Sequence, residues 1–183
     1  VRLDRNPLLR VHPCTIFPES TGWPDTKLRT APPRAQLAFA LMVPRSLNGT
    51  VLVTGGAGYI GSHTVRALRD TGRDVVVLDS LELGHRDAVV DAPLVVGDIR
   101  DRDLVTAICN DHGVTQLVHF AAYKAVGESM VQPAKYWRNN VSATVELIEA
   151  SLASGVHDFV FSSSCSVNGT PETVPVTETA PIH

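Results

Sequence analysis

Hydrophobic residues along most of the chain follow two alternating patterns. Five short apolar runs, rich in valine and leucine, are typical of buried strands. Between several of them, apolar residues recur every three or four positions, as on one face of a helix. This alternation predicts an α/β fold with a doubly wound parallel sheet in the strand order 3-2-1-4-5. The predicted strands are residues 50–54, 74–78, 94–96, 116–121 and 158–162.

Three helices are predicted between these strands. The first covers residues 60–70. The second begins after Asp101, a residue type that caps helix N-termini, and ends at Gly113. The third covers residues 134–153 and follows a proline, which suits the first turn of a helix. Its predicted buried stripe consists of Trp137, Val141, Val145, Leu147, Ile148 and Leu152.

A glycine-rich turn joins the first strand to the first helix. In this turn Gly55 permits a tight bend, Gly58 allows close approach of a ligand's phosphates, and Gly61 lets the helix pack on the strand. Phosphates would then meet the free N–H groups and the positive dipole end of the helix. Strand, glycine turn and helix in this order predict a Rossmann dinucleotide site.

Asp79 strengthens this prediction. It follows the second strand and stands 18 residues after Gly61, where a carboxylate can accept hydrogen bonds from the adenosine ribose. The next residues, Ser80, Leu81 and Glu82, are not basic, which favours NAD over NADP as cofactor. The alternative for Asp79 is a solvated turn residue.

The ends of the third and fourth strands supply further candidates, because ligands bind at the carboxyl edge of open α/β sheets. Asp98 can bond the adenine amino group, while Ile99 packs on the ring. Lys124 can reach a ribose or phosphate oxygen from the small residues that follow the fourth strand. A turn residue and a solvated lysine are the respective alternatives for Asp98 and Lys124.

Two sets of polar residues later in the chain each have two alternative interpretations. Asn139 and Asn140 lie on a packed helix and need hydrogen-bond partners, so one can hold the cofactor or a loop while the other faces solvent. The hydroxyl run 162–166 ends the fifth strand, where a substrate would meet the nicotinamide. Such a run is otherwise a turn.

Composition narrows the class of protein. The chain has 183 residues, 44% of them hydrophobic, which is typical of one globular domain. Residues 49–183 contain 9 basic and 16 acidic groups, a poor balance for binding nucleic acid. The three cysteines are far apart and argue against a metal site or a disulfide framework. A cytoplasmic protein without a membrane span is expected.

Residues 1–48 differ from the rest, since they hold seven of the twelve prolines. We expect a disordered tail or translated upstream sequence, followed by the nucleotide-binding domain at 49–183. The apolar stretch 35–43 is a possible short helix, badly placed for a signal peptide. An organellar transit segment is an alternative reading of the arginine content. Met42 is the hypothetical natural start.

With these residues placed, segments of 50–183 resemble the amino-terminal part of the UDP-glucose 4-epimerases, which are extended short-chain dehydrogenase/reductases. The glycine motif is shared widely, whereas the segment Lys124-Ala-Val-Gly-Glu-Ser129 is narrower and points to the 4-epimerases. The resemblance rests on Thr54-Gly-Gly-Ala-Gly-Tyr-Ile-Gly-Ser-His63, Leu78-Asp79, Gly97-Asp-Ile-Arg100, His119-Phe-Ala-Ala-Tyr-Lys-Ala-Val-Gly-Glu-Ser129, Asn139-Asn-Val141 and Phe161-Ser-Ser-Ser164.

The resemblance implies NAD-dependent interconversion of UDP-glucose and UDP-galactose, by oxidation at C4, rotation of the 4-keto sugar and re-reduction. It implies that Ser164 is a catalytic residue that bonds the reacting oxygen, and that the protein is a homodimer with a UDP-sugar substrate. The implied cofactor-binding residues are Gly55, Gly58, Tyr59, Ile60, Gly61, Asp79, Ser80, Leu81, Glu82, Leu83, Gly84, Asp98, Ile99, Phe120, Ala121, Ala122, Tyr123, Lys124 and Asn139.

Two features depart from the family pattern. Asn168 stands where the family usually has tyrosine. The catalytic tyrosine and the lysine four residues later should fall beyond His183, because none of the three tyrosines has a lysine at that spacing. We therefore expect a domain incomplete at its C-terminal side, without a substrate domain and without turnover. A non-catalytic NAD-binding module, a fragment of an interrupted gene, or another sugar-nucleotide epimerase or dehydratase are the alternatives.

Overall fold

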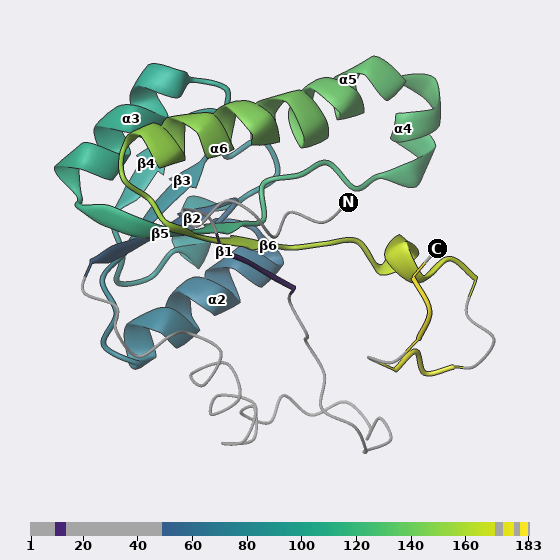
Figure 1. The fold of residues 1–183 in the computed structure, drawn as a ribbon, viewed down its shortest axis with the longest axis horizontal. Helices are drawn as coiled ribbons and strands as arrows, with labels where there is room; N and C mark the ends of the chain where they lie inside the picture. Colours follow the sequence, from purple (N-terminus) through teal and green to yellow (C-terminus); the bar gives the residue numbers. More distant parts are fainter. Residues whose placement is uncertain (1–9, 14–48, 171–173, 178–179, 183) are drawn as a thin grey trace.

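The computed structural model describes residues 10–13, 49–170, 174–177 and 180–182 (Figure 1). A sheet of six parallel strands forms its centre, in the order β1-β6-β5-β2-β3-β4. The predicted order of the five strands from residue 50 onward is confirmed. The strands are β1 (Arg10–Pro13), β2 (Thr50–Thr54), β3 (Val75–Asp79), β4 (Leu94–Val96), β5 (Val114–His119) and β6 (Asp158–Phe161).

Helices cover both faces of the sheet, as the doubly wound prediction requires. Figure 1 shows α2 (Tyr59–Asp70) on one side, and α3 (Arg102–Asp111) and α6 (Ala143–Ala153) on the other. Asp101 caps α3 as predicted, accepting a hydrogen bond from the Leu104 N–H at 3.0 Å. The chain therefore buries its central strands from both sides.

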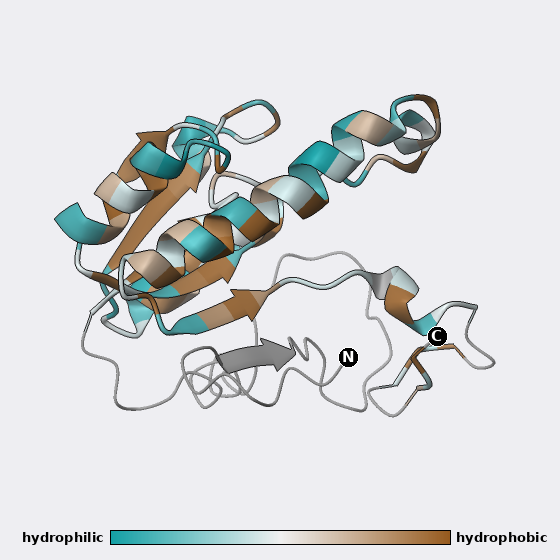
Figure 2. Cartoon of the chain, turned by 45° about the horizontal axis from the view of Figure 1, so that its top comes forward, coloured by the Kyte–Doolittle hydropathy of each residue, from teal (hydrophilic) through white to brown (hydrophobic). Residues whose placement is uncertain are grey.

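Alternate side chains of each central strand enter different cores. Leu52 of β2 packs in the core beneath α3 and α6, whereas its neighbours Val51 and Val53 pack in the core with α2. The same division separates Val76 from Val77 in β3. The central strands are mostly brown, that is hydrophobic, in Figure 2 because both of their faces are buried.

The predicted long helix is built from three connected segments preceded by a short helix, α4 (Val126–Val131). They are α5 (Pro133–Trp137), the π-helix η2 (Arg138–Ser142) and α6. Two short 3₁₀ turns complete the regular structure of the described residues, η1 (Arg86–Ala88) and η3 (Cys165–Asn168).

The predicted buried stripe of this helix is largely wrong. Trp137, Val141 and Val145 are 66%, 45% and 51% exposed, although Leu147 is fully buried. The helix carries two apolar faces, and periodicity alone does not say which one meets the sheet. The face with small side chains is buried, because it permits close packing beside α3. It consists of Ala143, Thr144, Leu147, Ala150 and Ser151.

The amino-terminal 48 residues contribute one described element. Residues 10–13 form β1, an edge strand parallel to β6 with Arg10 in register with Asp158, where the sequence predicted no regular structure. The possible helix at 35–43 and the hypothetical start at Met42 lie outside the described residues. That 1–48 is a tail separate from the domain stays a prediction.

Candidate functional site

The glycine turn between β2 and α2 lies at the carboxyl edge of the sheet and is closely packed. Gly55 has φ +73°, and a Cβ on it would lie 2.7 Å from the Ala121 nitrogen. A Cβ on Gly61 would lie 2.2 Å from the Gly55 carbonyl oxygen. These two glycines therefore hold the turn against β5 and helix α2 against the turn, as predicted.

The N-terminus of α2 is left open. Its N-cap is Gly58, which has no side chain to bond the first-turn N–H groups, and the first turn contains no acidic residue. A Cβ on Gly58 would meet only the Gly55 carbonyl oxygen, at 3.3 Å. Tyr59 and Ile60 are 81% and 49% exposed at this end. Unsatisfied N–H groups and the helix dipole at this opening fit an anionic group such as a pyrophosphate.

Asp79 joins this turn to residues 79–85, which we name the ribose loop after the role that the sequence predicts for Asp79. Its carboxylate is buried and accepts hydrogen bonds from the Ala57 N–H at 2.9 Å and the Leu81 N–H at 2.8 Å. A third bond, from the His85 N–H to the Ala57 carbonyl at 3.0 Å, holds the far end of the loop. The ribose loop and the glycine turn are thus one connected unit.

The other residues of the ribose loop differ in exposure. Leu81 has φ +59°, a conformation that a side-chain-bearing residue rarely adopts, and the Asp79 carboxylate supports it. Ser80 accepts a hydrogen bond from the Glu82 N–H at 3.3 Å. Leu83 is 73% exposed, and Gly84 is packed so closely that a Cβ would lie 2.8 Å from Asp79 Oδ1.

Asp98 follows β4 and is paired with Arg100. The guanidinium lies 2.9 Å from Asp98 Oδ1 through Nε and also bonds Oδ2, while the Arg100 N–H donates to Oδ1. These hydrogen bonds hold the pKa of Asp98 below its ordinary value. Ile99 is 5% exposed and belongs to the hydrophobic core, so its side chain is turned away from solvent.

Asn140 holds the loop after β5. This is one of the roles that the sequence left open for Asn139 and Asn140. The Oδ1 of Asn140 accepts from the Tyr123 N–H at 2.9 Å, and its Nδ2 donates to the Tyr123 carbonyl at 2.8 Å. Asn139 donates to Asn140 Oδ1 at 3.0 Å. Lys124 is exposed and forms no ion pair with any other described residue.

Removing the Asn140 amide is expected to destabilise the domain. Asn140→Ala leaves the Tyr123 N–H and carbonyl without partners, and we expect the free energy of unfolding to fall by about 2 kcal/mol. Asn139→Ala is the matched control and should cost less than about 1 kcal/mol, because it removes one bond between side chains. Urea denaturation measures both. Equal losses in the two variants would contradict the assignment.

His119, the buried last residue of β5, has a role that was not predicted from the sequence. Thr144 donates to the Asn140 carbonyl, so its hydroxyl accepts from His119 Nε2–H at 3.0 Å. Nδ1 is then the acceptor for the Thr54 hydroxyl at 2.6 Å. Burial lowers the pKa of His119 from 6.5 to about 4, which keeps the ring neutral. The sequence feature that could have identified His119 is a polar residue at the end of an otherwise apolar run.

Ser164 lies beyond β6, at the start of η3. It is exposed, accepts a hydrogen bond from the Ser166 N–H at 3.2 Å, and its Oγ lies 2.6 Å from the Ser166 Oγ. Asn168 donates to the Ala180 and Pro181 carbonyls at 3.4 and 3.1 Å, so it ties the following segment back to η3. Neither residue contacts the glycine turn through a hydrogen bond.

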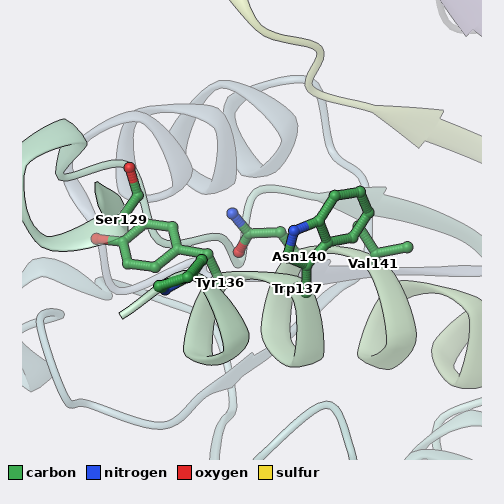
Figure 3. Close-up of a pocket in the computed structure, with 6 residues that line it drawn as sticks. Ser129, Tyr136, Trp137, Asn140 and Val141 are labelled. Carbon is green, nitrogen blue, oxygen red and sulfur yellow. The ribbon is translucent and has the colours of Figure 1, made fainter. Parts of the chain in front are cut away.

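A separate groove of about 310 Å³ lies along α4 and α5 (Figure 3). It contains none of the predicted cofactor-binding residues. In Figure 3 the Asn140 side chain lies between the rings of Tyr136 and Trp137. The lining residues are Ser129, Pro133, Tyr136, Trp137, Asn140 and Val141.

Two features are absent from the residues that the structure describes. These residues contain no helix long and apolar enough to cross a membrane. They also contain no group of three or more histidine, cysteine, aspartate or glutamate residues placed to hold a metal ion.

Taken together, the parallel sheet, the close-packed glycine turn and the open N-terminus of α2 define a dinucleotide-binding domain of the Rossmann class. The model of the NAD dependent epimerase/dehydratase family matches residues 51–183. The chain belongs to this family.

Its relatives include named epimerases. It is 48% identical over 132 residues to the UDP-glucose 4-epimerase of Azospirillum brasilense, covering 72% of this chain and 38% of the relative. The enzyme of Lactobacillus helveticus is also 48% identical, over 134 residues, with 73% and 41% covered. The chain thus spans about two fifths of the length of these relatives.

Solved structures show the same similarity. UDP-glucose 4-epimerase from Stenotrophomonas maltophila, with bound NAD and formylated UDP-arabinopyranose, matches with a TM-score of 0.69 and 40% identity. That match covers 74% of this chain and 43% of the other. The Brucella ovis enzyme in complex with NAD has the same TM-score and identity, covering 74% and 42%.

Proposed function

We propose that the chain binds NAD at the carboxyl edge of its sheet and is the nucleotide-binding part of a UDP-glucose 4-epimerase. The observation that carries the proposal is the open N-terminus of α2, where Gly58 leaves the first-turn N–H groups accessible beside the anchored Asp79. Relatives of known structure that are named UDP-glucose 4-epimerases contain NAD, which supports this choice of cofactor.

Different predicted residues would contact different parts of the dinucleotide. Gly55, Gly58 and Gly61 with the backbone of Tyr59 and Ile60 would hold the pyrophosphate. Residues 79–84 of the ribose loop, with Asp79 first, would surround the adenosine ribose. The paired Asp98 would accept from the adenine amino group, with Ile99 contributing its backbone. Residues 120–124 and Asn139 would line the nicotinamide side.

In the epimerase reaction NAD takes a hydride from C4 of the UDP-sugar and returns it to the opposite face. This chain's contribution is to bind and orient the cofactor, and Ser164 would bond the reacting oxygen. A tyrosine with a lysine four residues later supplies the proton transfer in the family. Tyr59, Tyr123 and Tyr136 are followed at that distance by histidine, glycine and asparagine. We therefore propose that the 183-residue polypeptide binds NAD without epimerase turnover.

Calorimetric titration and thermal unfolding of the 183-residue protein test both statements. NAD at a hundred times its Kd should raise the free energy of unfolding by about 2.7 kcal/mol, whereas NADP should do less because its 2′-phosphate meets Asp79. UDP-galactose should not be converted. Failure of NAD to stabilise the protein would overturn the binding proposal, and measurable conversion would overturn the absence of turnover.

The homodimer implied by the family resemblance is a further proposal. Trp137, Val141 and Val145 form an exposed apolar stripe on the long helix, a surface on which a second copy can pack. Size-exclusion chromatography with light scattering checks it, with the Val145→Lys variant as comparison. A monomer at all concentrations would contradict the proposal.

A further inference from the structure

Three charged or phenolic side chains connect the ribose loop to elements far away in the sequence. Tyr123, after β5, donates a hydrogen bond from Oη to Glu82 of the ribose loop. Lys135 of α5 lies 3.6 Å from Glu82 Oε1 and 4.2 Å from the centre of the Tyr123 ring. We call Glu82, Tyr123 and Lys135 the latch.

Lys135 is itself held in place from the other side. Its Nζ lies 2.9 Å from Glu128 Oε1, and the Tyr136 hydroxyl, with one proton to donate, lies 2.8 Å from Glu128 Oε2 and 2.9 Å from the Ala125 carbonyl oxygen. Lys135 is charged at neutral pH, and its hydrogen bond to Glu128 raises its pKa further. These contacts connect the latch to α4 and α5. It is therefore a network of contacts and not a single ion pair between flexible surface side chains.

The ribose loop needs such support on its outer side. Asp79 and His85 bind it to Ala57, and between these anchors Leu81 adopts the unfavourable φ of +59°, with its N–H bonded to Asp79 within the same loop. A residue in that conformation persists only where its surroundings hold it. Glu82 follows Leu81 directly, so a tether on Glu82 restrains the strained position from the outside.

We propose that Tyr123 and Lys135 are positioning residues that, through Glu82, hold the ribose loop in the conformation that receives the adenosine end of the cofactor. This inference rests on the proposed NAD binding. The latch joins the ribose loop to the segment after β5, and these two segments flank the glycine turn. Without it the loop would relax around Leu81, and each binding event would have to order the loop again.

The test is calorimetric titration of the full chain with NAD and with AMP, which carries only the adenosine end. We expect Tyr123→Phe to raise the Kd for both ligands about tenfold, since the phenol–carboxylate hydrogen bond is charge-assisted. Glu82→Gln should act similarly, and the double variant should be little weaker than either single one. Glu149→Gln is the matched control, because it removes an exposed ion pair with Arg102 that involves no residue of the latch, and it should stay within about twofold of the parent.

Hydrogen exchange of the ligand-free protein tests the latch independently of cofactor binding. Tyr123→Phe should speed exchange at the Leu81 and Glu82 amides while the β2 amides and the melting temperature stay unchanged. Unchanged exchange together with unchanged AMP affinity would overturn the latch even if the parent binds NAD. If the parent binds neither ligand, the proposed function fails, and the exchange data still decide whether the latch holds the loop.

Discussion

A Gly61→Ala chain is expected to lose about 3 kcal/mol of unfolding free energy and to stop binding NAD. The added Cβ would lie 2.2 Å from the Gly55 carbonyl oxygen and 2.7 Å from the Gly56 Cα. Both are backbone atoms of the turn, so no side chain can rotate away to make room. Helix α2 would have to move off the strand, which spoils the core packing and the open helix N-terminus together.

Gly127→Ala is the matched control for this change. Gly127 lies in α4 and has no atom within 4 Å of its would-be Cβ. Alanine there should be neutral or stabilise the protein by up to about 1 kcal/mol, because it lowers the entropy of the unfolded chain. Urea denaturation at pH 7 measures both variants. A Gly61→Ala protein within about 0.5 kcal/mol of the parent would contradict the packing argument.

Acidification from pH 7 to pH 4 is expected to cost the domain about 3 kcal/mol through His119 alone. The folded protein holds the pKa of this histidine at about 4, below its ordinary value of 6.5. The unfolded chain therefore binds the proton first, and stability falls as the pH drops from about 6.5 towards 4. The contribution is complete above this window and levels off below it. The size follows from 1.36 kcal/mol for each unit of pKa difference.

Urea denaturation between pH 7 and pH 4.2 tests this, with His119→Gln as the comparison. Glutamine keeps a donor and an acceptor for Thr54 and Thr144 but does not titrate, so its stability should vary less in this window. Asp98 interferes little, because its lowered folded pKa removes stability only below its ordinary value of 3.8. Parallel pH profiles of the two proteins would mean that another group is responsible.

Patterns within short stretches of the sequence were enough to predict the strands and the glycine turn. The apolar runs predicted the five strands from residue 50, and glycines at fixed spacing before a helix predicted the turn. Asp79 could be singled out because it ends a strand at a known distance from Gly61. These features depend on backbone geometry and on neighbours within a few residues, so one chain segment contains the information.

Only the tertiary structure decided which groups meet across the sheet edge. Glu82 and Tyr123 are 41 residues apart, and Asn140 reaches back 17 residues to hold Tyr123. The long helix has two apolar faces, and contact with α3 and the strands chose the one with small side chains. Burial keeps His119 neutral, and its two ring nitrogens bond Thr54 and Thr144, which lie on different elements. Such contacts depend on which elements pack together, and residue periodicity within one element does not carry that information.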